Sequence, residues 1–167
     1  MRRLVLVAAF ALGIGGCGGR EREPREAPPL TFEEIHDTTG LSKGPEVVRT
    51  FEPYRMENGA MRARGRLAFP DGTRIQLTVF PVGGQQMLAR VQFEVYDGGF
   101  DTPPILGPKG PLPEGNYHFE LMTFFEQSWQ PPDVMEKTGN GRDLRGPGIT
   151  RGRNGEAAFV HTEDHRL

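Results

Sequence analysis

The sequence predicts an all-β protein, a two-layer antiparallel β-sandwich of about seven strands with one or two short helices. Apolar and polar side chains alternate with a period of two in several stretches, beginning at residues 60–69. Turn-forming residues separate these stretches roughly every 8 to 12 positions. The chain holds 23 glycines and 15 prolines, and their placement between alternating stretches indicates turns rather than disorder.

Residues 60–69 show the alternation most clearly, because small or apolar side chains hold the odd positions and arginines hold even ones. The odd positions are Met61, Ala63, Gly65, Leu67 and Phe69, and the even ones include Arg62, Arg64 and Arg66. This pattern is typical of a half-buried antiparallel strand. We expect the three arginines on a hydrated sheet face, which could also meet an acidic polymer or lipid head groups.

The next strands follow from the turns between them. Residues 70–72, Pro-Asp-Gly, supply a turn, and the partner strand at 73–80 places Ile75, Leu77 and Val79 on one face. A reversal at 83–84 precedes a long strand at 86–96, which turns at 97–99 into a short strand near Phe100. The inward residues expected on that long strand are Met87, Ala89, Val91, Phe93 and Val95.

The remaining elements are shorter. Five prolines in 101–115 restrict that segment to loop or edge strand. Strands are expected at 118–124 and 156–161, the latter with Ala157, Phe159 and His161 on one face, and a weaker one at 46–51. A capping box that begins at Thr31 indicates a short helix at 32–37, and Pro132 and Gly139 bracket one or two further helical turns.

A tyrosine precedes the strand at 118–124, in the run Leu-Pro-Glu-Gly-Asn-Tyr at 112–117. This L-P-x-G-x-Y pattern resembles the start of a late strand in immunoglobulin-like and transthyretin-like sandwiches. In those domains the tyrosine hydroxyl bonds a nearby backbone group. The resemblance therefore implies this role for Tyr117 and this type of sandwich.

A broader resemblance rests on four stretches, RLAFPDGTRIQLTV, VQFEVYDGGF, GPLPEGNYHFEL and SWQPPDVMEKTGNGRDLRGPG. They are similar to a group of uncharacterised bacterial lipoproteins and surface proteins that carry a single sandwich domain. The likeness covers residues 61–150, with Phe69 where the group has leucine, a change that conserves volume. Because the shared motifs are turn chemistry, the resemblance implies a fold, and the group has no established activity.

The N-terminus has the features of an export signal. Arg2 and Arg3 precede an apolar run at 4–14, which ends in small residues and the single cysteine, Cys17. The run is shorter than the ~20 residues of a membrane-spanning helix. The quartet at 14–17, Ile-Gly-Gly-Cys, resembles the lipobox of bacterial lipoproteins. This implies cleavage between Gly16 and Cys17, with covalent diacylglycerol and a fatty acid such as palmitate on Cys17.

The expected export signal and lipidation site divide the chain into three segments. Residues 1–16 form a lipoprotein signal peptide, 17–30 a lipidated, solvated tether rich in proline and charge, and 31–167 the sandwich domain. We expect an exported protein held by lipid at the cell membrane or outer membrane, with its domain outside the cytoplasm. An envelope protein or polysaccharide is the expected partner.

Composition excludes several activities. Without Arg2 and Arg3, the mature chain has four more acidic than basic side chains, which argues against nucleic-acid binding. Its only cysteine is assigned to lipid, so no thiol catalysis, disulfide or thiolate metal site is expected. Ser42 and Ser128 are the candidate serine nucleophiles, and neither lies in a G-x-S-x-G elbow. We therefore expect no catalytic residues, no metal and no cofactor beyond the lipid.

Two segments are candidate binding surfaces. Phe124 and Phe125 cannot both point inward from one strand, so one of them, with Trp129 and Tyr96, could form a stacking platform or protein anchor. Their alternative role is to plug the open end of the sandwich. The second segment is a glycine-rich loop whose guanidinium groups could bind an anion or simply pack over the sandwich. Its arginines are Arg142, Arg145, Arg151 and Arg153.

The function expected is a non-catalytic binding or structural accessory module of the envelope. One alternative is an envelope enzyme or metal-dependent factor that uses His118, His161 and nearby carboxylates. It requires two imidazoles and a carboxylate within about 5 Å of a common point. His161 and His165 would be about 13 Å apart on a strand, so a solvated tail is expected there. Another alternative, a carbohydrate-binding module, requires Trp129 exposed on a groove.

Overall fold

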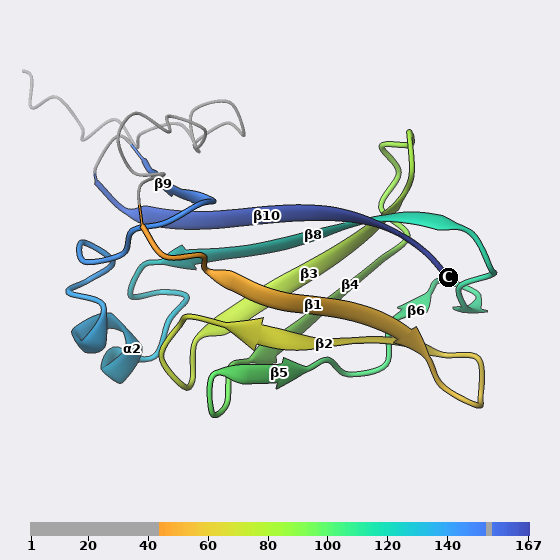
Figure 1. Ribbon diagram of the computed structural model, residues 1–167, viewed down its shortest axis with the longest axis horizontal. Coiled ribbons are helices and arrows are strands. Elements are labelled where there is room, and N and C mark those ends of the chain that lie inside the picture. The colour runs from red at the N-terminus through yellow and green to blue at the C-terminus, as the bar shows by residue number, and fades with distance from the viewer. Residues whose placement is uncertain (1–43, 153–154) are drawn as a thin grey trace, which may run out of the picture.

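The computed structural model describes residues 44–152 and 155–167, which form a two-layer antiparallel β-sandwich (Figure 1). One layer has three strands in the order β1-β2-β5 and the other has five in the order β4-β3-β8-β10-β9. The first layer comprises β1 (Val48–Arg55), β2 (Met61–Leu67) and β5 (Gly99–Asp101). The second comprises β3 (Arg74–Pro81), β4 (Ala89–Glu94), β8 (Asn116–Phe125), β9 (Ile149–Arg151) and β10 (Ala157–Arg166).

The fold class expected from the sequence is therefore confirmed. The proline-rich segment forms only a small hairpin of two-residue strands, β6 (Leu106–Gly107) and β7 (Gly110–Pro111). The helical turns expected between Pro132 and Gly139 form the short helix α2 (Pro132–Lys137). The expected signal peptide, the tether and the helix at 32–37 lie outside the described residues. No helix among the residues described is long and apolar enough to cross a membrane.

The core lies between the two layers, and a group of phenylalanines packs there among aliphatic side chains. Phe51 of the three-stranded sheet meets Phe119 of the five-stranded sheet edge-on at 5.5 Å between ring centroids. Phe93 and Phe100 stack at 4.7 Å. Phe69 closes one end against Phe125 and Phe159, with centroids 5.3 and 5.1 Å away. Burial of these rings on both inner faces is what holds the layers together.

One inward residue was predicted wrongly. The strand expected at 86–96 begins only at Ala89, because the hydrogen-bonded ladder with β3 starts at the Val79–Ala89 pair. Met87 therefore lies before the strand and is 45% exposed. Ala89, Phe93 and Val95 are buried as expected, and Val91 is half-buried.

The prediction of a solvated tail at residues 161–165 is also wrong. β10 runs to Arg166 because it pairs with β8 over ten positions, from Ala157–Phe125 to Arg166–Asn116. Beyond the strand, Leu167 and Gly115 exchange two backbone hydrogen bonds of 2.7 and 2.9 Å. The C-terminal segment is thus part of a full strand that pairs with β8 along its whole length and with β9 only at Ala157–Phe159.

Candidate functional site

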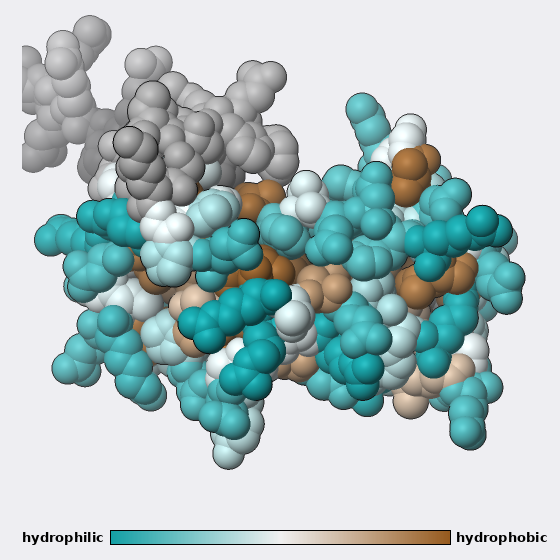
Figure 2. All heavy atoms as spheres, in the orientation of Figure 1, coloured by the Kyte–Doolittle hydropathy of each residue, from teal (hydrophilic) through white to brown (hydrophobic). Residues whose placement is uncertain are grey.

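A groove of about 680 Å³ crosses the outer face of the three-stranded sheet, on the side of β2 from which its arginines project. Side chains from four strands or strand ends line it, and the surface over β2 and β5 is mainly hydrophilic (Figure 2). The charged and aromatic members are Glu52 of β1, Arg64 and Arg66 of β2, Asp101 of β5, and Glu94 and Tyr96 at the end of β4. A hollow of this size is in the range of small-ligand sites.

Tyr96 stands at the rim of the groove on a rigid hairpin. The two residues after it, Asp97 and Gly98, both have positive φ, of 51° and 64°, as a tight two-residue hairpin turn requires. Tyr96 and Gly99 exchange backbone hydrogen bonds of 2.8 and 2.9 Å, and the Gly98 N–H donates to Asp71 Oδ1 at 3.2 Å. The tyrosine is nevertheless 82% exposed. The turn therefore fixes the backbone at Tyr96, and the aromatic ring extends into solvent.

The carboxylates of the groove are each ion-paired. Glu52 meets Arg64 at 2.9 Å and Glu94 meets Arg74 at 3.2 Å. Asp101 meets Arg62 at 3.1 Å and also accepts a hydrogen bond from the Tyr54 hydroxyl at 3.1 Å. Two of the three arginines of β2 are thus neutralised by carboxylates, so this face is not the cationic stripe that the sequence alone suggests.

Arg66 differs from its neighbours. Its guanidinium donates to a backbone oxygen, Asp97 O, at 3.3 Å, and no ion pair with a carboxylate is found for it within the described residues. Arg66 therefore retains hydrogen-bond donors for a molecule bound in the groove near Tyr96.

The Glu52–Arg64 pair also sets the local electrostatics. The hydrogen bond from Arg64, reinforced by its charge, lowers the pKa of Glu52, and the same hydrogen bond raises the pKa of Arg64. The Arg64 guanidinium lies 5.3 Å from the centroid of the Tyr54 ring, within cation–π range. Both groups therefore stay ionised near neutral pH and present an ion pair on one side of the groove.

The aromatic surface expected at 124–129 is arranged differently from a stacking platform. Phe125 is buried in the core, while Phe124 lies on the outer face of β8 and is half-buried. The Trp129 indole N–H points into the protein, within 3.3 Å of Arg74 O and 3.2 Å of Thr123 Oγ1. Trp129 thus helps to close the end of the sandwich.

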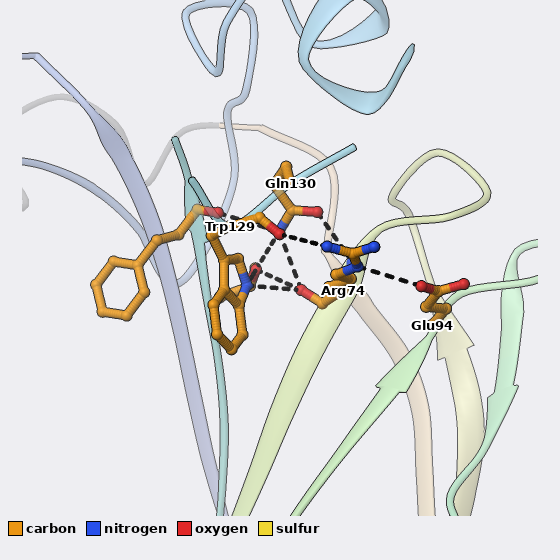
Figure 3. Close-up of polar contacts among 6 residues, drawn as sticks. Arg74, Glu94, Trp129 and Gln130 are labelled. Atoms are coloured by element: carbon orange, nitrogen blue, oxygen red, sulfur yellow. Dashed lines mark hydrogen bonds and ion pairs between the residues drawn. The ribbon is translucent and has the colours of Figure 1, made fainter. Parts of the chain in front are cut away.

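Gln130 completes this closure (Figure 3). Its side-chain Oε1 accepts the Arg74 N–H at 3.0 Å, and its Nε2 lies 3.0 Å from Arg74 O and 2.7 Å from Thr123 Oγ1. Arg74 is the first residue of β3, so its backbone groups need partners at the end of the ladder. The Gln130 amide supplies them in the way a further strand would.

The arginine-rich loop is held by its own side chains. Arg151 donates to three backbone oxygens, Gly141 O at 2.6 Å, Arg142 O at 2.9 Å and Leu144 O at 3.3 Å. Arg145 donates to Leu144 O at 2.6 Å. Burial, with a contribution from the nearby Arg145, lowers the pKa of Arg151. Arg153 lies outside the described residues. At least two of the four arginines therefore serve the loop itself.

His118 and His161 lie on opposite faces of the five-stranded sheet and so cannot share an ion. On the outer face, His118 Nδ1 is 2.6 Å from Asp164 Oδ1. On the inner face, Glu163 stands between His161 and His165, with its oxygens 3.3 and 3.0 Å from their Nε2 atoms. Two imidazoles and a carboxylate therefore lie together, but the histidines are His161 and His165 rather than the expected His118 and His161. No set of three such residues in the described part has the arrangement to hold a metal ion.

Gly16 and Cys17, the expected cleavage and lipidation residues, lie outside the residues that the structure describes. Comparison of the chain with known protein families, curated proteins and solved structures finds no match. The fold and the groove therefore define the class of protein, an all-β sandwich with a polar, tyrosine-rimmed groove on its smaller sheet.

The sequence indicates Tyr96 and the arginines of β2 as separate features and does not place them in one site. Arg66 and Tyr96 are far apart in the chain and line the same groove because β2 pairs with β5, through Arg66–Gly99, directly after the hairpin that carries Tyr96. The signal that could have found the site is the Tyr-Asp-Gly-Gly run, which is typical of a hairpin turn with a tyrosine at its base.

Proposed function

We propose that this chain is an exported, lipid-anchored protein of the cell envelope whose sandwich domain is a non-catalytic binding module. Its contact surface is the groove on the three-stranded sheet. The single observation that carries the binding role is Tyr96, an aromatic ring 82% exposed on a rigid turn beside a ligand-sized groove. An exposed aromatic ring on a fixed backbone beside polar groups is typical of recognition surfaces.

The anchor rests on the sequence. The signal-like segment at 1–16 and Cys17 support export and lipidation, and residues 17–30 supply a tether that lets the domain reach its partner. Replacing Cys17 with Ser should release the protein from the membrane fraction. Continued membrane retention of Cys17→Ser would contradict the lipid anchor.

The non-catalytic assignment is supported by the polar geometry. The Ser128 hydroxyl donates to Glu126 at 2.8 Å and has no imidazole partner in the part of the chain described. The groove carboxylates are all held in ion pairs with arginine, so none is positioned as a free general base. Ion-paired groups of this kind can orient a ligand without reacting with it.

The binding role is tested with envelope fractions. The protein released by Cys17→Ser should still bind delipidated envelope material, and Tyr96→Ser in the same background should abolish this binding. Leu106→Ser is the matched control, because Leu106 is another exposed apolar residue, 49% exposed and outside the groove. Equal binding of the Tyr96 and Leu106 variants would contradict the groove as the contact surface.

A further inference from the structure

We propose that the groove on the three-stranded sheet binds a neutral polysaccharide, with one pyranose ring stacked on Tyr96 and neighbouring hydroxyl groups hydrogen-bonded to Arg66 and the paired carboxylates. This inference rests on the proposed binding function and names the ligand class of the same site. Four properties of the groove support it: the exposed ring, the balanced charge, the planar hydrogen-bonding groups and the extended shape.

The exposed ring provides the stacking surface. Other large apolar side chains on the described surface are about half exposed, with Val82, Met87 and Leu106 between 45% and 49%, whereas Tyr96 is 82% exposed. An aromatic face is an apolar, slightly electronegative plane. The C–H face of a pyranose ring is flat, apolar and weakly electropositive, so it complements this plane. Because the Asp97–Gly98 turn already fixes the backbone at Tyr96, only the side-chain torsions of the ring have to be ordered on binding.

The charges of the groove favour a neutral ligand. Arg64 and Arg66 stand against three carboxylates, and each of those carboxylates already has an arginine partner within 3.2 Å. An anionic polymer would meet carboxylates at every step along the groove, and a cationic one would meet arginines. A polyhydroxyl chain carries no charge to repel and can use both the acceptors and the donors.

The groups that flank Tyr96 have the geometry to bind hydroxyl pairs. A guanidinium is a planar fork of N–H donors and a carboxylate is a planar pair of acceptors. Vicinal sugar hydroxyls both donate and accept, so two neighbouring hydroxyls can bind each kind of fork. Arg66 donates to only one backbone oxygen among the described residues, and Glu94 faces the same groove from the end of β4.

The shape of the groove fits a chain rather than a single sugar. It extends from Thr50 and Glu52 on β1, across Arg64 and Arg66 of β2, to Asp101 of β5 and the Tyr96 rim. It is an open depression on a sheet face, and Gly99, which lies opposite Arg66, contributes no side chain to obstruct it. A linear polysaccharide can lie across the strands with one ring at Tyr96.

The direct test uses the detergent-solubilised lipidated full-length protein and a panel of purified linear polysaccharides. The neutral probes are glucans, mannans and galactans, and the acidic probes are alginate and polygalacturonate. We expect binding to at least one neutral probe, little changed by added salt, because the contacts are not between net charges. Tyr96→Ala should weaken it roughly tenfold or more, the loss typical of a truncated aromatic contact, while Tyr96→Trp should retain it.

Matched controls keep the result interpretable. Leu106→Ala should leave binding unchanged, and Arg66→Met should weaken it while conserving much of the side-chain volume. Because Tyr96 is exposed, its substitution should change stability by no more than about 0.5 kcal/mol, so a loss of binding reports the ligand contact rather than unfolding. Failure to bind any neutral probe, or binding that Tyr96→Ala does not affect, would overturn the proposal.

A second arm separates this inference from the proposed function. Envelope material is treated either with periodate, which cleaves vicinal diols, or with protease, before the Cys17→Ser protein is added. Binding that depends on Tyr96, survives protease and is lost after periodate supports a polysaccharide ligand. Binding that depends on Tyr96 but is lost after protease and survives periodate overturns the polysaccharide and leaves the binding module intact. Binding that does not depend on Tyr96 overturns both.

Discussion

Arg55 on β1 and Tyr117 on β8 donate hydrogen bonds to the same backbone oxygen, Pro113 O. Arg55 also donates to Leu112 O at 2.8 Å and to Gly59 O at 3.2 Å. Because β1 and β8 belong to different sheets, this shared acceptor ties both layers to one loop at the end of the sandwich. The tyrosine corner implied by the L-P-x-G-x-Y pattern is therefore present, and an arginine from the opposite sheet reinforces it.

We expect Tyr117→Phe to lower the free energy of unfolding by about 0.5–1.5 kcal/mol, the net value of one buried hydrogen bond. Urea unfolding followed by circular dichroism measures the change. Tyr54→Phe is the control, because it removes the same hydroxyl from an exposed contact with Asp101 and should cost less. Equal losses in the two variants would show that the corner adds nothing beyond a surface hydrogen bond.

The Gln130 side chain should be more important for stability than its single position suggests. It is 3% exposed and bonds both the N–H and the C=O of Arg74 (Figure 3). Gln130→Ala leaves the Arg74 N–H without that partner, at a cost of about 1–3 kcal/mol, whereas Arg74 O keeps the Thr123 hydroxyl and the Trp129 indole N–H as donors. Gln127→Ala, at an exposed neighbouring position, should be nearly neutral. A midpoint of thermal unfolding that is unchanged in Gln130→Ala would contradict the role of the amide.

The accuracy of the sequence-based prediction depended on how local each feature is. Strand positions and turns follow from alternation and turn residues within a few positions, and these were predicted well from residue 60 to residue 80. The sequence required one of Phe124 and Phe125 to point outward, and the pleat of β8, with His118 and Glu120 on its outer face, makes Phe124 the outward one. The length of β10 was underestimated because its ladder with β8 pairs residues more than thirty positions apart.

The candidate site shows the same limit. Its residues come from β1, β2, β5 and the end of β4, in three separate stretches of sequence at 50–52, 64–66 and 94–101. The pairing of each carboxylate with an arginine also depends on cross-strand register, as in Glu52 opposite Arg64. The sequence shows the residue types, but the contacts that neutralise the arginines appear only once the strands are paired.

The Glu52–Arg64 pair gives a prediction for pH. The pKa of Glu52 should lie below its ordinary value of 4.5, because Arg64 donates a hydrogen bond to the carboxylate and carries the opposite charge. Since the folded-state pKa is lower than the unfolded one, the pair stabilises the fold above the unfolded pKa, and this contribution is lost as pH falls through the folded pKa. An NMR titration of the Glu52 carboxyl carbon should show the lowered pKa, and Arg64→Gln should bring it back toward 4.5. The same titration midpoint in both proteins would contradict the assignment.

Zinc should not stabilise the protein through the histidines of β10. His161, Glu163 and His165 alternate along one face of the strand, but they do not have the arrangement of a metal site. A site filled at 100 times its dissociation constant would add about 2.7 kcal/mol and raise the unfolding midpoint by several degrees. We expect no such rise on adding Zn²⁺. A rise that His165→Ala removes would favour the metal-dependent alternative, with His165 in place of His118.

Arg151 should stabilise the glycine-rich loop through its three carbonyl contacts, with Gly141, Arg142 and Leu144. Hydrogen bonds from a charged donor are worth about 1.5–3 kcal/mol when buried, and these are partly exposed, so Arg151→Ala should cost roughly 1–2 kcal/mol. Lysine cannot reproduce the planar fork, so Arg151→Lys should recover only part of the loss. The rate of amide hydrogen exchange across residues 139–148 should rise in both Arg151 variants. It should not rise in Arg90→Ala, a control at an exposed position. Unchanged exchange in Arg151→Ala would mean that the loop is held by its buried Ile149 and backbone turns alone.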